Sequence, residues 1–443
     1  MRYAKAAVSV IVLAVSVWAL HTPHGMVPPI GKLANPFAGF WRNNDATDKI
    51  PRKLDLPGLQ EEVRVVWDDL RIPHIFARND HDLYMAQGYV MARDRLWQME
   101  FIARYAGGRL SEIVGPRALD QDRYHRRLGM TWAAENLLKG LESEAELKAG
   151  LEAFGEGVNA HIRSLRRAAY PLEYKILDYA PEPWTPLNSA LILKYMALDL
   201  TGGNRDFALT RLKEEMGESL VDELFPFVAP FQDPVIPPGT VWGFKAGQPG
   251  PAGLAGTPSS PKPSGKIPAA DPWDDFIGSN NWALAGARTK SGFPILANDP
   301  HLALNLPSIW YALQLSAPGV NVFGIALPGA PGVIIGFNEN LAWGMTNAGS
   351  DVLDWFKIQF KDANRKEYFY EGAWRSTTVR REEIKVRGRG ARRGGNRLHA
   401  SWPRSLPRGR SVRRSRPPRR LRPSLGGPRP ERRRQDDFRG QPG

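Results

Sequence analysis

The chain has 443 residues, enough for one large domain or two to three smaller ones. With 42% hydrophobic residues and 14 Trp it can bury a core, which excludes global disorder. The absence of Cys excludes disulfides, thiolate metal sites and Cys nucleophiles. The net charge is +14, but residues 387–443 alone carry 19 Arg and three acids, a charge of +16. Residues 1–386 are therefore nearly neutral, at −2.

The N-terminus has the pattern of an export signal. Arg2 and Lys5 precede an uncharged apolar run over residues 6–20. A short positive segment followed by about 15 apolar residues is typical of a secretory signal peptide or a short membrane anchor. The pattern predicts such a segment over residues 1–23, and an exported protein that is periplasmic or anchored in the membrane. The alternative is a buried N-terminal helix.

The first half of the chain is predicted to be mainly helical. Residues 61–77 look like two strands around a turn, because β-branched residues flank Asp68 and Asp69. Apolar residues then recur at helical spacing in four stretches. The first is a helix that is capped by Asp80 and ends at Gly107. The others are residues 132–170, residues 187–200 after the helix-breaking string EPWTP (182–186), and the residues after Asp206.

The pattern of apolar residues changes after a linker. Residues 246–271 contain 6 Pro and 5 Gly in 26 positions, which predicts an exposed linker without packed elements. Residues 282–386 consist of short apolar runs between Gly, Pro and Asn, ending with WFKIQF (355–360), and this pattern predicts strands. Helices followed by strands favour an α+β layered fold.

The tail over residues 387–443 lacks hydrophobic periodicity and is rich in Arg, Pro and Gly, so we predict that it is disordered. One interpretation is a basic arm that binds RNA. The other is a GC-rich gene read out of frame, since many codons for these three residues are GC-rich. The second is favoured, because regular RGG units and interleaved aromatic residues are missing, and no nucleic-acid partner is expected.

One short motif carries a specific chemistry. Gly278-Ser279-Asn280-Asn281-Trp282 lies directly after the linker and directly before a predicted strand. If the Gly278–Ser279 bond is cut, Ser279 gains a free α-amine with a reference pKa near 8. That amine can take the proton of the Ser279 hydroxyl, so the nucleophile carries its own base. The alternative is an ordinary Gly-Ser turn.

Several strings in a fixed order resemble the penicillin acylase family of N-terminal-nucleophile amidohydrolases. The resemblance covers residues 62 to about 386, through these strings: IPHIFA (72–77), the D-x-x-x-A-x-G-Y-x-x-A-R-D-R-L-x-Q-M stretch (82–99), GGRLSEIVG (107–115), EPWTP (182–186), GSNNWALAG (278–286), LANDPHL (296–302) and GFNENLAWGMTN (336–347). It implies a four-layer αββα sandwich, incomplete at the C-terminus. It also implies a precursor that cuts itself into an α-chain (24–245), a spacer (246–278) and a β-chain (279–386), which stay partners of one another.

The resemblance assigns roles residue by residue. Ser279 matches the nucleophile, with the cut between Gly278 and Ser279. His301 matches a position whose backbone orients substrate and nucleophile, and the backbone N–H of Asn347 matches an oxyanion donor. A structural calcium ion is implied, and the matching ligands are Asp206, Asp351, the carbonyl of Leu353, and Asp354. The alternative for these carboxylates is a solvated loop.

The implied substrate is a small N-acyl amide. The acyl pocket of relatives is lined by apolar residues, and the matching positions here are Met196, Leu200, Leu302, Ile335 and Met345. Met and Leu on a helix are more often core residues, so that alternative stays open. The family also has a second oxyanion donor, an Asn, in a part of the β-chain that has no match after Val386. We therefore expect a truncated or frame-disrupted chain that is inactive. The alternative function is an exported, non-enzymatic envelope protein whose basic tail binds nucleic acid or anionic lipid.

Overall fold

The computed structural model describes residues 2–23, 29–43, 53–202, 205–226, 278–347, 352–388 and 397–402, with backbone alone for Arg205 and for 397–402. The predicted spacer lies outside these ranges except for Gly278, and so does most of the predicted tail. The chain divides into two units by its contacts, and one of them comprises residues 228–268 and 405–443. The elements described below belong to the other unit.

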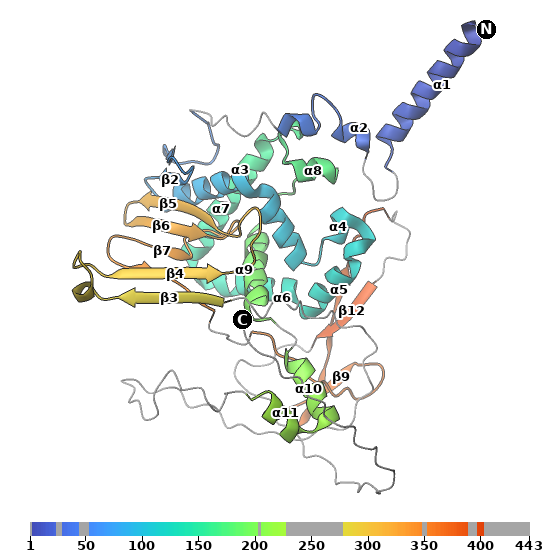
Figure 1. The fold of residues 1–443 in the computed structure, drawn as a ribbon. Coiled ribbons are helices and arrows are strands. Elements are labelled where there is room, and N and C mark those ends of the chain that lie inside the picture. The colour runs from blue at the N-terminus through green and yellow to red at the C-terminus, as the bar shows by residue number, and fades with distance from the viewer. Residues whose placement is uncertain are drawn as a thin grey trace, which may run out of the picture. The chain divides into compact units, whose positions relative to one another are not determined.

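The helices occupy most of the first half of the chain, and the strands most of the second (Figure 1). The helices are α1 Arg2–His21, α2 Ile30–Leu33, α3 Asp80–Ala106, α4 Ser111–Val114, α5 Leu119–Leu128, α6 Met130–Gly140, α7 Ala145–Ser164, α8 Leu172–Ile176, α9 Pro186–Thr201, α10 Arg205–Met216 and α11 Glu218–Leu224. The strands are β1 Arg64–Trp67, β2 Pro73–Phe76, β3 Gly278–Leu284, β4 Ile295–His301, β5 Tyr311–Ala317, β6 Val320–Ala326, β7 Ile335–Phe337, β8 Ala342–Trp343, β9 Glu367–Tyr370, β10 Ala373–Ser376, β11 Thr378–Glu383 and β12 Arg397–Trp402.

A six-stranded sheet joins the two halves of the sequence. Its order is β1-β2-β5-β6-β7-β8, so strands from before and after the predicted cut site are neighbours. β2 and β5 run parallel, and the other pairs are antiparallel. At the parallel junction His74 lies opposite Gln314, and their side chains form a 2.6 Å hydrogen bond. Mixed helices and sheets confirm the predicted α+β class.

The main core lies between this sheet and helix α3. Leu83, Met91 and Met99 of α3 are fully buried in one cluster with Leu313 and Leu315 of β5. Side chains at alternate positions of β5 are buried, as expected for a strand with one face on a core. Burial of such a side chain contributes roughly 1.5–3 kcal/mol, so this cluster accounts for much of the stability of the α3–β5 region.

Two glycines allow helices α3 and α7 to cross closely. A methyl group on Gly88 would lie 2.0 Å from the carbonyl oxygen of Phe154, and one on Gly157 would lie 1.8 Å from that of Met85. Both distances are far below any van der Waals contact, so only Gly fits at these two positions. The crossing brings Phe154 and Val158 of α7 into the core cluster.

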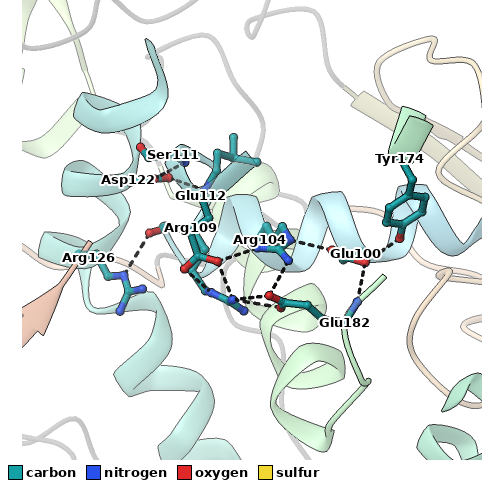
Figure 2. Close-up of polar contacts among 11 residues, drawn as sticks. Glu100, Arg104, Arg109, Ser111, Glu112, Asp122, Arg126, Tyr174 and Glu182 are labelled. Carbon is teal, nitrogen blue, oxygen red and sulfur yellow. Dashed lines mark hydrogen bonds and ion pairs between the residues drawn. The ribbon is translucent and has the colours of Figure 1, made fainter. Parts of the chain in front are cut away.

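A network of buried charges connects the end of α3 with the loop before α9 (Figure 2). Arg104 is 3% exposed and its guanidinium lies 2.7 Å from carboxylate oxygens of Glu100, Glu112 and Glu182. Arg109 adds ion pairs to Glu112 and Glu182. Burial raises the pKa of Glu100, although Arg104 and the Tyr174 hydroxyl act against that shift. Since buried charges are tolerated only when paired and hydrogen-bonded, this network fixes how its segments pack.

Residues 378–387 lie against the helical region. Arg380 makes a two-pronged ion pair with Glu135 of α6, with bonds of 2.5 and 2.9 Å, and also contacts Glu382. Glu382 in turn pairs with Arg126 of α5. The backbone N–H of Arg387 donates to the carbonyl of Ser111 at 2.9 Å. These contacts attach the end of the predicted β-chain to the predicted α-chain.

The structure confirms most predicted elements and corrects three. The first helix is capped by Asn79, whose side chain accepts a bond from the N–H of Asp82, and Asp80 is already helical. WFKIQF forms no strand beyond an isolated bridge at Phe360, and the ring of Trp355 packs against that of Phe207 of α10. The tail was predicted to be disordered, but β12 pairs with β11, from Thr378 opposite Trp402 to Glu383 opposite Arg397.

The N-terminal apolar run forms a 20-residue helix, α1, none of whose residues is buried. The alternative of a buried N-terminal helix is therefore wrong. By length and composition α1 could cross a membrane, and a signal sequence has the same properties. It is the one such helix within the part of the chain that the structure describes.

Candidate functional site

Ser279 and His301 meet across a β-hairpin. Strands β3 and β4 form a separate two-stranded antiparallel sheet, in which Gly278 pairs with His301 and Ser279 with Pro300. The backbone N–H of His301 donates a 3.3 Å hydrogen bond to Oγ of Ser279. The structure therefore brings together two of the three predicted catalytic residues, although they are 22 positions apart in the sequence.

A carboxylate that the sequence analysis did not single out holds the His301 ring. Nε2 of His301 lies 2.6 Å from Oδ2 of Asp299. Asp299 and His301 are two positions apart on β4, so their side chains share one face of the strand. Both side chains are more than half exposed, at 57% and 53%. The pair is thus accessible to solvent.

Asn298 connects this hairpin to the segment that follows β8. Its Nδ2 donates to the carbonyl of Asn280 at 2.9 Å and to that of Met345 at 3.1 Å, and its Oδ1 accepts from the N–H of Met345 at 2.9 Å. Gly344 makes room for this contact, because a methyl group there would lie 2.7 Å from the Asn298 side chain. The string LANDPHL contained Asn298 and Asp299, but only the cross-strand register reveals what they contact.

Asn347, the predicted oxyanion donor, lies two residues beyond that contact. Its side-chain Nδ2 donates a 2.7 Å hydrogen bond to the carbonyl of Leu200 in helix α9. This bond fixes the backbone at Asn347 relative to α9. Asn298 and Leu200 therefore hold the two ends of residues 345–347, on the hairpin side and on the helix side.

The five predicted pocket residues occupy different surroundings. Met196 of α9 is buried in the main core, against which Leu200 and Leu302 pack. Ile335 lies on β7 and pairs with Ile325, whereas Met345 is 54% exposed. A 470 Å³ cavity lies elsewhere, lined by Gly107, Arg109, Arg126, Thr131, Glu182, Pro183, Thr185, Leu187, Asn188 and Leu191. None of the predicted site residues lines that cavity, so its role is not that of the predicted acyl pocket.

The predicted metal ligands come from two segments that touch. Phe207 of α10 and Trp355 lie with their ring centroids 5.9 Å apart, which places the neighbourhood of Asp206 beside that of Leu353 and Asp354. Asp351 lies outside the described residues. Within the described ranges no group of three or more His, Asp or Glu side chains could hold a metal ion. Carboxylates and a main-chain carbonyl are ligands of the kind that calcium takes, so the chemistry of the donor set fits that ion.

Comparison with known proteins extends the likeness over most of the chain. The sequence model of the penicillin amidase family matches residues 62–413. The chain is 33% identical over 355 residues to acyl-homoserine lactone acylase QuiP of Pseudomonas aeruginosa, which covers 79% of this chain and 41% of that protein. It is 35% identical over 342 residues to penicillin acylase 2 proenzyme of a Pseudomonas species, strain SE83, covering 76% of this chain and 42% of that protein.

A solved structure, thermostable penicillin G acylase from Alcaligenes faecalis, is similar at 23% identity with a TM-score of 0.36, covering 40% of this chain and 97% of that one. The family match settles the class, and the chain belongs to the penicillin amidase family. It spans about two fifths of the length of the two curated relatives just compared.

Proposed function

We propose that this protein is an amide hydrolase that cuts its own Gly278–Ser279 bond and then uses Ser279 as an N-terminal nucleophile. The observation that carries this proposal is the hydrogen bond from the His301 N–H to Oγ of Ser279, across the hairpin pair that flanks the cut. It holds the hydroxyl in a defined position. The fold proposed for the whole protein is the four-layer αββα sandwich, of which the six-stranded sheet and α3 form part.

After the cut, the residues act in a simple order. The α-amine of Ser279 takes the proton of the hydroxyl as Oγ attacks the substrate carbonyl. The backbone N–H of Asn347 stabilises the oxyanion, since a main-chain donor held in place needs no reorganisation as charge develops. The protonated amine then gives its proton to the leaving amine. Water hydrolyses the acyl-enzyme and releases the acid.

The substrate class is a small N-acyl amide. By their names, one similar protein is an acyl-homoserine lactone acylase and another is a penicillin acylase. Both kinds of compound carry an acyl group on a nitrogen, so the shared chemistry is cleavage of a linear amide. Met196, Leu200, Leu302, Ile335 and Met345 are proposed to contact the acyl group. Helix α1 is proposed to direct export, to the periplasm or to the membrane.

Calcium is proposed as a structural ion, held by Asp206, Asp351, Asp354 and the carbonyl of Leu353. The ion would supply positive charge that joins the α10 segment to the segment around Trp355, and so the two chains after the cut. Asp354→Ala should then lower the melting temperature and abolish its dependence on added calcium. The same melting temperature with and without a chelator would remove the ion from this proposal.

The decisive experiment is to purify the full chain and determine its masses and N-termini. We expect a chain that begins Ser-Asn-Asn-Trp, and we expect Ser279→Ala to remain uncut. Cut protein is then assayed with chromogenic N-acyl amides, which measures its rate of turnover. An uncut parent that hydrolyses these amides would refute the mechanism.

A further inference from the structure

A short segment after α1 presents apolar side chains to solvent. Residues 29–43 contain α2 and a 3₁₀ turn over Phe40–Asn43. Four of the apolar side chains are exposed, namely Ile30 at 51%, Phe37 at 82%, Phe40 at 37% and Trp41 at 58%. The ring centroids of Phe40 and Trp41 lie 3.9 Å apart. Single exposed apolar residues are ordinary, but a group of them in one segment is typical of an interaction surface.

The backbone of this segment is fixed to the helical body by polar contacts. Nζ of Lys175, a residue of α8 that is 1% exposed, donates to the carbonyl of Gly39 at 3.1 Å and to Oδ1 of Asn43 at 2.7 Å. Nζ of Lys32 lies 3.0 Å from Oδ2 of Asp178. The exposed apolar side chains are therefore carried on a backbone that the body holds in place.

The same segment lies against the C-terminal end of α1. A methyl group on Gly31 would lie 3.0 Å from the carbonyl oxygen of Leu20 and 3.1 Å from the ring of His21. The 20 residues of α1, at 1.5 Å each, span about 30 Å, which is the thickness of the hydrocarbon core of a bilayer. Arg2 and Lys5 predict that the N-terminal end stays in the cytoplasm. With α1 across the membrane, Gly31 lies in the outer headgroup layer, which extends roughly 5–8 Å beyond the hydrocarbon core.

The chemistry of residues 29–43 suits the headgroup layer. Aromatic side chains, Trp above all, are enriched at the boundary between hydrocarbon and water, because an apolar ring carries a polar group that still needs a partner. The indole N–H of Trp41 donates to the carbonyl of Ala34 at 3.2 Å, so its polar group is already satisfied. The segment contains two basic residues and no acidic one, so it does not repel anionic headgroups.

We propose that residues 29–43 form a membrane-contact surface, whose four exposed apolar side chains enter the headgroup layer beside a retained α1. This inference rests on the role of α1 proposed above and is independent of the cut and of amide hydrolysis. The partner is a phospholipid bilayer. Because Lys175 joins this surface to the body, the protein is held close to the membrane in one orientation.

The test uses the absence of Cys from the chain. Pro36→Cys creates a single thiol beside Phe37, keeps all four apolar side chains, and is labelled with an environment-sensitive fluorophore. The full chain is reconstituted from detergent into vesicles of phosphatidylethanolamine and phosphatidylglycerol, some of which carry a nitroxide near the headgroup. We expect the emission of the Pro36→Cys probe to shift to shorter wavelength and to be quenched by the nitroxide lipid.

The control site for this probe is Leu147, which is 61% exposed at the start of α7. α7 leads from there toward Tyr170, whose carbonyl accepts a 3.0 Å hydrogen bond from Asn43, so Leu147 is at the far end of α7 from that contact. The Leu147→Cys probe should show neither the shift nor the quenching.

A pair of variants tests the aromatic side chain itself. Phe37→Ser, added to Pro36→Cys, should remove most of the shift and of the quenching, while α1 keeps the protein in the vesicles. Phe293→Ser is the matched control, because Phe293 is 72% exposed and lies outside the surface, between β3 and β4. It should leave both signals unchanged. If Phe37→Ser does not fold, Trp41→Ser takes its place.

The outcomes separate this inference from the earlier proposals. Protein with an intact α1 that does not sediment with the vesicles refutes both the membrane role of α1 and this inference. An N-terminus that lies after α1 in protein purified from cells refutes the inference and leaves export standing. A Pro36→Cys probe that is quenched no more than the Leu147→Cys probe refutes the membrane-contact surface alone, and so does unchanged quenching in Phe37→Ser. A loss of amide hydrolysis bears on the proposed function and not on this surface.

Discussion

The network around Arg104 and the Asp299–His301 pair use the same kinds of charge in opposite surroundings. Arg104 is 3% exposed and meets three carboxylates, so its charge is already used within the fold (Figure 2). Asp299 and His301 lie 2.6 Å apart but are more than half exposed. A short distance between two charged groups therefore does not by itself indicate a functional site. The pairs of Arg104 hold segments together and are buried, whereas the Asp299–His301 pair is open to solvent.

Aromatic residues repeat this contrast. Trp184, in the loop before α9, is 4% exposed and donates from its indole N–H to Ser189, whereas Trp282 on β3 is 54% exposed. A two-stranded hairpin alone is marginally stable in water, so β3 and β4 depend on contacts such as those of Asn298. Substitutions in the helical region should therefore lower the global stability. Substitutions in the hairpin should mainly change the rate of the proposed cut between Gly278 and Ser279.

The largest effect on stability is expected at the buried network. Arg104→Met removes the shared partner of Glu100, Glu112 and Glu182, and breaking a buried pair in this way costs about 3–5 kcal/mol. Urea denaturation followed by circular dichroism measures the loss. Arg211→Met is the control, because the Arg211–Glu215 pair is exposed and contributes about 0.5 kcal/mol or less. Equal losses in both variants would contradict the contrast between buried and exposed pairs.

The next effect is a pH dependence set by His161 of α7. Its ring packs edge-on against Tyr89, its Nδ1 has no hydrogen-bond partner among the described residues, and burial lowers its pKa from 6.5 to about 4. The unfolded chain therefore binds a proton between these values while the folded chain does not. The contribution of His161 to stability is complete above pH 6.5 and falls as the pH is lowered toward 4, by about 3 kcal/mol at roughly 1.4 kcal/mol per pKa unit.

His161→Leu should flatten this dependence in urea titrations at pH 7 and 4.5. His81 provides a control of opposite sign, because bonds to Asp82 and Glu156 raise its pKa against the effect of burial. His81→Gln should lose stability at pH 5 rather than at pH 7.5. If both variants keep the pH dependence of stability that the parent protein shows, neither histidine sets it.

A smaller effect on stability, with a larger one on the cut, is expected from Gly344→Ala. The added methyl would lie 2.7 Å from Asn298 and 2.8 Å from Nδ2 of Asn281. Asn281 is exposed and can shift, but Asn298 is half-buried, so the expected cost is about 1–2 kcal/mol. The shift also displaces the hairpin that presents Ser279. Gly140→Ala is the control, since nothing lies within 4 Å of a methyl group there. A Gly344→Ala protein that cuts as fast as the parent would uncouple Asn298 from the site.

The smallest effect concerns the attachment of residues 378–387. The two-pronged hydrogen bond from Arg380 lowers the pKa of Glu135, so the pair favours the folded protein. Both side chains are about one third exposed, which limits this contribution. Arg380→Gln should therefore cost about 1 kcal/mol or less in urea denaturation. Arg375→Gln, which breaks the exposed pair with Glu371, is the matched control with no measurable loss. A cost above that of Arg104→Met would reverse the comparison.

The sequence predicts most elements but few of the contacts that matter. Strong periodicity located the strands within 61–77 and the helices within 80–200, because apolar spacing follows from local geometry. Asn79 was missed as a cap, since Asp80 is an equally good capping residue by type. Asn298 and Asp299 were invisible as site residues, because their roles depend on a cross-strand register that no local pattern encodes. Strand β12 was missed because Arg-rich composition masked the alternation of Leu398, Ala400 and Trp402.

The parallel pairing of β2 with β5 imposes a delay during biosynthesis, because its two strands are far apart in the sequence. His74 and Gln314, bonded at this junction, are 240 positions apart. At about 5–20 residues per second, the ribosome needs roughly 12–50 s to deliver Gln314 after His74 has been made. During that interval the hydrogen-bonding edge of β2 has no partner, and an unpaired edge is a template for association with other chains. A nascent chain of this protein therefore has a period of vulnerability, in which a chaperone that binds extended segments should find β2.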